Sequence, residues 1–144
     1  MQPRKHENTK KTIMLRINST LPTETEELIT RVIGCCIDVH RALGPGLLET
    51  PYSRAVGLEF DHCGIIYTRE KEIEVSYRGQ VLCQQRLDFV VADQVVLEIK
   101  SVDHLNPVHR AQIMNYMRLA KIRAGLLMNF NVAVLPDGIK RIVL

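Results

Sequence analysis

The sequence lacks a long hydrophobic run, an internal repeat and a paired-cysteine motif. Its longest apolar stretch near the N-terminus, Ile13-Met14-Leu15, is too short for a signal-peptide core, and no segment approaches the length of a membrane span. The four cysteines form no Cys-x-x-Cys pair, so a structural zinc is not indicated and a reducing compartment is favoured. We expect these cysteines in apolar surroundings, in a soluble, cytoplasmic protein that does not contact membranes.

An excess of one charge sign is also absent from most of the chain. The formal net charge of +3 arises from 19 basic and 16 acidic residues, but four of the basic residues and one acidic residue lie in residues 1–11. The remaining residues therefore carry 15 charges of each sign. We interpret residues 1–20 as a flexible basic N-terminal arm that is mainly solvated. Residues 21–144 form a single domain that is long enough to bury one core.

Hydrophobic periodicity in residues 21–144 predicts the order α-α-β-β-β-α-β-β. A capping box formed by Thr23 and Glu26 begins the first helix, and Gly44-Pro45-Gly46 ends it. Asn106 caps the third helix, which is expected to end near residue 123. The remaining elements are a helix from about residue 47 to 63, a hairpin over residues 65–91, and strands over residues 95–100, 124–130 and 139–144. This order predicts an α/β fold in which helices pack against a sheet.

Charged residues interrupt two neighbouring apolar strands of this sheet. Glu98 and Lys100 are two residues apart and therefore point to the same side of their strand. A salt bridge on a solvated face would explain this pair by itself. However, Asp88 interrupts the preceding strand, and the turn over residues 92–94 brings it within cross-strand reach of Glu98. Two like charges at this separation are unfavourable unless a cation lies between them, and a hard divalent ion with oxygen ligands would supply that cation.

Asp88 followed by Glu98-Ile99-Lys100 resembles the PD-(D/E)xK phosphodiesterase signature. The resemblance implies a restriction-endonuclease-like core with a central mixed sheet flanked by helices. In that superfamily the acidic pair binds Mg²⁺ or Mn²⁺, which implies that Asp88 and Glu98 are metal ligands. It also implies that Lys100 orients or polarises the attacking water.

The segment Gly46-Leu47-Leu48-Glu49-Thr50-Pro51-Tyr52 matches Gly-x-x-Glu-x-x-Tyr, the motif that names the GxxExxY protein family. The resemblance covers about residues 25–144. It implies that Glu49 is a third carboxylate of the metal site, acting directly or through water. The alternative is an ordinary carboxylate in the first turn of a helix, and Pro51 could alter its direction.

Gln112 and Tyr116 are four residues apart on the third predicted helix, on a face shared with Val108 and Leu119. They resemble the Gln-x-x-x-Tyr element of the RecB-like branch. This resemblance implies that both side chains line the site and position the substrate or the catalytic lysine. The alternative is a Gln that is hydrogen-bonded within the core beside a packing Tyr.

The leading hypothesis is a divalent-metal-dependent nuclease that hydrolyses DNA, in preference to RNA, by metal-activated water. Its catalytic residues would be Asp88, Glu98, Lys100 and Glu49. The alternative is a non-catalytic nuclease-fold module that binds or regulates through a partner protein or as a homodimer, because the neutral domain supplies little electrostatic grip on nucleic acid. A third hypothesis is a non-enzymatic protein with a structural ion pair.

Overall fold

The structure is a computed structural model that describes residues 19–144. Within these residues the helices and strands follow one another in the predicted order, with one short 3-10 helix in addition. The elements are α2 (Thr23–Leu43), α3 (Glu49–Cys63), β1 (Tyr67–Tyr77), β2 (Gln80–Val91), β3 (Val95–Lys100), α4 (Pro107–Ala120), β4 (Ala124–Asn129), the 3-10 helix η1 (Leu135–Gly138) and β5 (Ile139–Val143).

The five strands form one mixed sheet whose spatial order follows the chain, β1-β2-β3-β4-β5. The first three strands are an antiparallel meander, β4 lies parallel to β3, and β5 pairs antiparallel with β4 at the edge. Parallel neighbours cannot be joined by a tight turn, and α4 provides the crossover between β3 and β4. The expected α/β core, a central mixed sheet flanked by helices, is confirmed.

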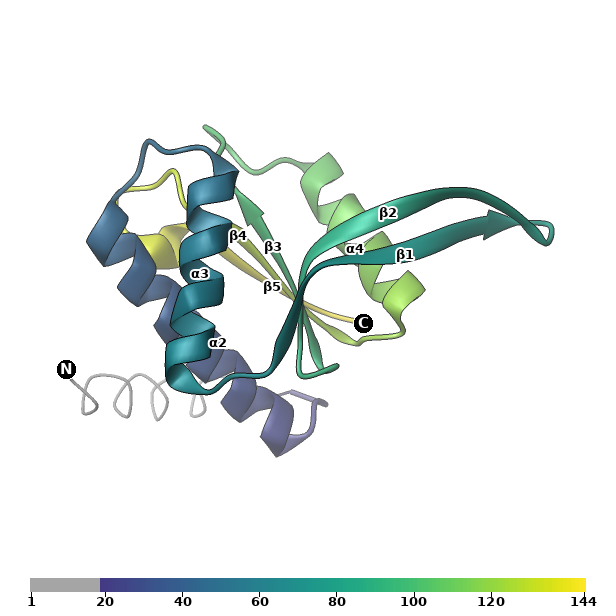
Figure 1. The fold of residues 1–144 in the computed structure, drawn as a ribbon, viewed down its shortest axis with the longest axis horizontal. Coiled ribbons are helices and arrows are strands. Elements are labelled where there is room, and N and C mark those ends of the chain that lie inside the picture. The colour runs from purple at the N-terminus through teal and green to yellow at the C-terminus, as the bar shows by residue number, and fades with distance from the viewer. Residues whose placement is uncertain (1–18) are drawn as a thin grey trace.

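Helices cover both faces of the sheet (Figure 1). The helices α2 and α3 pack on one face, over a core to which β3 contributes Leu97 and Ile99. The helix α4 packs on the other face, over a smaller core that includes Val96. Because side chains alternate along a strand, Glu98 and Lys100 share with Val96 the face that α4 covers.

The hairpin of β1 and β2 extends beyond the body of the fold as an arm (Figure 1). A register shift between Val75 and Ser76 marks a bulge near its end. Beyond the bulge the side chains leave the core, and Tyr77, Val81 and Leu82 are 64%, 57% and 62% exposed. The arm therefore presents apolar side chains that the rest of the described chain does not cover.

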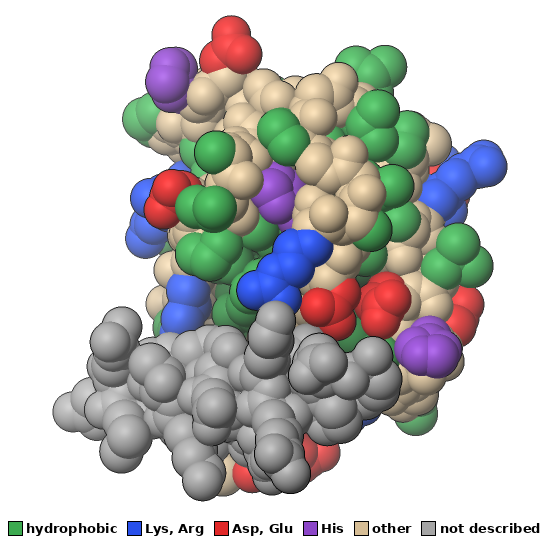
Figure 2. All heavy atoms as spheres, turned by 90° about the vertical axis from the view of Figure 1, so that its left-hand side faces the viewer, with side chains coloured by type: hydrophobic (Ala, Val, Ile, Leu, Met, Phe, Trp, Pro, Cys, Tyr) green, Lys and Arg blue, Asp and Glu red, His purple; other side chains and the backbone are tan. Residues whose placement is uncertain are grey.

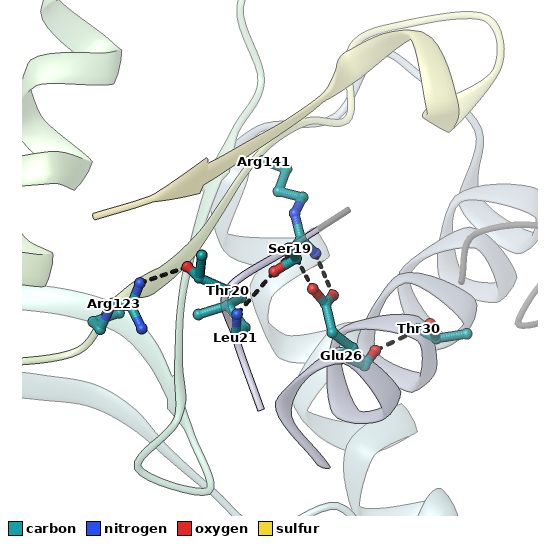
Figure 3. Close-up of polar contacts among 7 residues, drawn as sticks. All are labelled: Ser19, Thr20, Leu21, Glu26, Thr30, Arg123 and Arg141. Carbon is teal, nitrogen blue, oxygen red and sulfur yellow. Dashed lines mark hydrogen bonds and ion pairs between the residues drawn. The ribbon is translucent and has the colours of Figure 1, made fainter. Parts of the chain in front are cut away.

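The start of α2 differs from the predicted capping box. Pro22 is the N-cap and no side chain caps the helix, so the expected box of Thr23 and Glu26 is wrong. Glu26 instead binds Arg141 of β5 through two contacts of 2.7 and 2.5 Å (Figure 3). These hydrogen bonds are the largest of the effects that lower the pKa of Glu26. Glu26 thus pairs with Arg141, 115 residues away in the sequence, and not with the start of its own helix.

The expected N-terminal arm falls largely outside the described residues, because residues 1–18 are not among them. Its last two residues, Ser19 and Thr20, are hydrogen-bonded to the body of the fold (Figure 3). Ser19 accepts from the Arg141 guanidinium at 3.2 Å, and Thr20 accepts from the Arg123 guanidinium at 2.8 Å.

The other helix ends follow their local signals. Gly44, with φ of 68°, ends α2 as predicted, and Gly64, with φ of 71°, ends α3 after residue 63. The Asn106 side chain accepts two backbone amide hydrogens and caps α4, also as predicted. That helix ends at Ala120, before the expected end near residue 123, because Lys121 adopts a left-handed conformation with φ of 58°.

The cysteines divide into two pairs by exposure. Cys35 and Cys36 are buried, as expected of small apolar side chains. Cys63 and Cys83 are exposed, so the prediction of apolar surroundings is wrong for these two. None of the helices within residues 19–144 is both long and apolar enough to span a membrane.

Candidate active site

Asp88 lies at a break in the regular geometry of β2. Leu87 packs on the α4 face of the sheet and Phe89 on the opposite face, although a regular strand would place both on one face. Glu70, opposite this position on β1, has a positive φ of 57°. The ladder between β2 and β3 ends at Phe89. Beyond Phe89 a side chain replaces the backbone as the partner of β3, because Oδ2 of Asp88 accepts a hydrogen bond from the Ile99 amide at 2.8 Å.

Glu98 makes the reciprocal contact from β3. Its side chain is buried, with 4% of the residue exposed. Its Oε1 accepts a hydrogen bond from the Asp88 amide at 3.0 Å. The two carboxyl groups also hydrogen-bond to each other, with Glu98 in its protonated form as the donor. The structure thus brings Asp88 and Glu98 together at the point where their strands separate.

Both carboxyl groups have raised pKa values. The pKa of Glu98 is raised from 4.5 to about 8. Burial is the largest cause of this shift, and the negative charge of Asp88 is the second. Burial is also the main reason why the pKa of Asp88 is raised. The backbone hydrogen bonds and the charge of Lys100 act against both shifts. Without a cation, the pair therefore retains a proton near neutral pH.

Lys100 ends β3 two residues after Glu98 and is half-buried. Its Nζ donates a hydrogen bond to Oε1 of Gln112 on α4 at 2.9 Å. Its positive charge lowers the pKa of both Asp88 and Glu98, which places it within electrostatic reach of the pair. The ammonium group is thus held by an amide oxygen and stays available to a ligand at the carboxylates.

Gln112 and Tyr116 line the same site from α4. Burial raises the pKa of Tyr116, and the charges of Glu98 and Asp88 raise it further, while a hydrogen bond with Gln112 lowers it. The Tyr116 hydroxyl also donates to Oε1 of Gln85 on β2 at 3.3 Å. Gln112 therefore lies between the lysine and the tyrosine.

The face of α4 differs in one respect from the prediction. Val108, expected on the same buried face as Gln112 and Tyr116, is 74% exposed. It belongs to the first turn, where α4 extends beyond the edge of the sheet core. The buried part of the helix begins at Ile113.

Glu49 is the first residue of α3 and is half-buried. Its negative charge contributes to the raised pKa of Asp88, so it lies within electrostatic range of that carboxylate. Among residues 19–144, however, no three side chains of His, Cys, Asp or Glu form a group ready to hold a metal ion. Glu49 therefore lies within electrostatic range of the pair and not in a closed cage with it.

The donor set fits a hard divalent cation. Mg²⁺ keeps several of its waters and is usually bound through one or two carboxylates together with substrate phosphate, not by a complete protein cage. Asp88 and Glu98 supply two such carboxylates, and they keep a proton that a cation would displace. Glu49 lies farther from the cation position than Asp88 and Glu98 do, which suits contact with the cation through a water molecule.

Asn129 is a site residue that sequence reasoning did not single out for a role. It is 3% exposed and pairs with Lys100 in the parallel ladder. Its amide donates to the Val102 carbonyl at 2.8 Å and accepts from the Val102 amide at 3.1 Å. It thereby holds the segment that follows Lys100. An amide at the end of an apolar run, Ala124 to Met128, was the available signal.

His40 is buried for a structural reason. Its Nε2 lies 3.1 and 2.9 Å from the carbonyl oxygens of Phe130 and Val132, so it donates to both. It lines a cleft of about 400 Å³ between the end of α2 and η1, together with Ile37 and Leu135. Figure 2 views the side of the molecule on which α2 and η1 lie and shows hydrophobic side chains gathered on it. The residues that line this cleft do not include the acidic pair.

The sequence was compared with family models, and the sequence and fold with known proteins. A family model described as the PD-(D/E)XK nuclease superfamily matches residues 26–142. The chain is similar to the crystal structure of SSO0001, with 18% identity and a TM-score of 0.41, over 96% of this chain and 75% of that one. It is also similar to an alkaline exonuclease (LHK-Exo) from Laribacter hongkongensis, with 14% identity and a TM-score of 0.38, over 94% and 75% of the two chains. No curated protein matches the sequence at a significant level.

Proposed function

Because the chain belongs to the PD-(D/E)XK nuclease superfamily, we propose that it is a Mg²⁺- or Mn²⁺-dependent phosphodiesterase that hydrolyses nucleic acid, DNA in preference to RNA. The observation that carries this proposal is the buried carboxyl pair of Asp88 and Glu98 with Lys100 beside it. A structural ion pair would not require two acids in contact, because their mutual repulsion destabilises the fold. Such an arrangement is typical of a site that works with a bound ligand.

Each residue has a defined task in this proposal. Asp88 and Glu98 hold the cation, with Glu49 reaching it through water. Lys100 orients the attacking water and stabilises the negative charge that develops on the phosphate oxygens. Gln112 keeps the lysine ammonium in place through the 2.9 Å hydrogen bond, and Tyr116 packs behind it. A bound Mg²⁺ or Mn²⁺ would lower the pKa of its water and neutralise phosphate charge.

Finer assignments within the superfamily rest on local motifs. We assign the chain to the GxxExxY group because Gly46 precedes α3 and Glu49 and Tyr52 lie in its first turn, and to the RecB-like branch because Gln112 contacts Lys100. We take residues 21–144 as the nuclease-like domain and residues 1–20 as an appended basic arm. The four free cysteines suit the reducing cytoplasm.

The test is cleavage of single- and double-stranded DNA, and of RNA, by the full chain with Mn²⁺, with Mg²⁺ and with EDTA. We expect cleavage with either metal and none with EDTA. Glu98→Gln and Lys100→Gln should each lower the cleavage rate at least about a hundredfold, the range found when a catalytic electrostatic group is removed. Lys140→Gln, an exposed change on β5, is the control and should cleave at the wild-type rate.

Cleavage that persists in EDTA, or equal rates for Glu98→Gln and wild type, would contradict the proposal. Mn²⁺ binding measured by calorimetry provides a second readout. Glu98→Gln should weaken it because one of the two carboxylates is lost.

A second candidate function is a nuclease-fold module that acts through a partner protein. The exposed apolar tip of the hairpin formed by β1 and β2, which consists of Tyr77, Val81 and Leu82, favours this candidate. So does the even balance of charges outside residues 1–11. Size-exclusion chromatography with light scattering would detect self-association, and replacement of these side chains by Ser would then disperse it. A monomer that cleaves DNA unaided would exclude the partner-dependent candidate.

A further inference from the structure

We infer that Tyr52 is a positioning residue whose hydroxyl fixes the segment over residues 44–48 and thereby aims Glu49 at the acidic pair. The inference rests on the proposed function, since it concerns the same site. It gives the last position of the Gly-x-x-Glu-x-x-Tyr motif a physical task. Tyr52 does not contact the acidic pair, so its effect must pass through the backbone that carries Glu49.

The Tyr52 hydroxyl makes two backbone hydrogen bonds across the loop that precedes α3. It donates to the Gly44 carbonyl at 2.5 Å and accepts from the Leu47 amide at 3.2 Å. In a helix, side chains lean toward the N-terminus, so a tyrosine in the first turn reaches back over the residues that precede the helix. Tyr52 follows Glu49 by three positions, so both belong to this first turn.

The ring of Tyr52 is fixed as firmly as its hydroxyl. It is completely buried and stacks on Phe130, with ring centroids 4.7 Å apart and an interplanar angle of 27°. The Phe130 amide in turn donates to the Lys100 carbonyl at 2.9 Å. The ring is therefore anchored to the end of β3, which carries the catalytic lysine.

The loop is attached to the same strand end a second time. The Ser101 hydroxyl donates to the Leu47 carbonyl. Leu47 thus receives one hydrogen bond from the residue after Lys100 and gives one to Tyr52. These contacts leave little freedom to the loop, although Gly44 and Gly46 have positive φ values of 68° and 101° and would otherwise make it flexible.

Glu49 depends on this arrangement because no side chain caps α3. The N-cap is Leu48, which has no side-chain hydrogen bond to the helix and is 76% exposed. The direction in which α3 begins is therefore set by the loop and by the Tyr52 hydroxyl. If the hydroxyl is lost, the first turn can fray and Glu49 can swing away from Asp88.

The experiment compares Tyr52→Phe with Tyr67→Phe in the full chain. Tyr67 is a matched control, because its hydroxyl also donates to α3, to the Gly57 carbonyl at 3.1 Å and to Asp61 at 2.8 Å, but far from Glu49. Tyr52→Phe keeps the stacked ring. It should weaken Mn²⁺ binding about tenfold and lower kcat by a similar factor with KM unchanged, as removal of groups that orient ligands does. Tyr67→Phe should leave both quantities unchanged.

A double-mutant cycle with Glu49→Gln distinguishes positioning from general loosening. If Tyr52 acts through Glu49, Tyr52→Phe should have no further effect on Mn²⁺ affinity in the Glu49→Gln background. Additive losses, equal losses in Tyr52→Phe and Tyr67→Phe, or wild-type Mn²⁺ affinity in Tyr52→Phe would each overturn the inference and leave the proposed function intact. A wild-type protein that neither binds Mn²⁺ nor cleaves nucleic acid would overturn both.

Discussion

Glu98→Gln should stabilise the protein when no metal is present, although it removes a residue of the proposed active site. The amide of Gln resembles the protonated Glu98. Its oxygen can still accept from the Asp88 amide, as Glu98 does at 3.0 Å, and its NH₂ group can donate to the Asp88 carboxylate. The variant therefore loses the charge that burial and Asp88 both disfavour, and keeps the hydrogen bonds.

The size of the stabilisation expected for Glu98→Gln follows from the pKa of Glu98. It is raised from 4.5 to about 8 in the folded protein, and at about 1.4 kcal/mol per pH unit this difference corresponds to about 5 kcal/mol. A raised carboxyl pKa means that the folded state binds the proton more tightly than the unfolded state. The free energy of unfolding of the wild type therefore falls between about pH 4.5 and about pH 8. Glu98→Gln lacks this loss, so its advantage should grow across that range toward about 5 kcal/mol as an upper limit.

The assay is urea unfolding at a series of pH values in EDTA, followed by circular dichroism. Glu74→Gln is the matched control, because it makes the same chemical change at an exposed position of the same sheet. It should change the free energy of unfolding by less than about 0.5 kcal/mol at every pH. With Mn²⁺ in excess, the difference in the free energy of unfolding between Glu98→Gln and wild type should become smaller, because the metal stabilises only a protein that binds it. Parallel pH profiles for wild type and Glu98→Gln would refute the assignment of a buried proton to this pair.

The remaining predictions concern the fold, and thermal or urea unfolding tests each of them. Arg141→Met should cost about 1.5–3 kcal/mol at neutral pH. Because the pKa of Glu26 is lowered from 4.5, this cost should shrink as the pH falls from about 4.5 through the lowered pKa, and a constant cost would argue against the ion pair. Gly138→Ala should cost about 1–3 kcal/mol, because the added Cβ would overlap the Asn129 carbonyl, and an unchanged midpoint would contradict this packing. Asn106→Ala should cost about 1 kcal/mol through loss of the helix cap, with Asn106→Asp retaining most of the stability.

The candidate site was predictable to the extent that its parts obey local rules. Glu98 and Lys100 share a face because strand geometry has a period of two, and Asn106 caps α4 because its side chain reaches its own backbone. The hydrogen bond from the Ile99 amide to the Asp88 carboxylate was not predictable, because it depends on a break in β2 that sequence periodicity does not reveal. The capping box at Glu26 failed for a related reason, since a distant guanidinium competes with the local amide.

By itself, the sequence determined the order of helices and strands, the turns that join them and the types of side chain that converge on one strand end. Those features depend on contacts between residues close together in the chain, and so they are written in local spacing. Only the tertiary structure decided that α4 covers the face of Glu98 and Lys100. It also decided that Glu49 lies within electrostatic range of Asp88, and that the Tyr52 hydroxyl ties the loop before Glu49 to α3. Burial raises the pKa of Glu98 to about 8, and burial is a property of the packed layers, which no segment possesses alone.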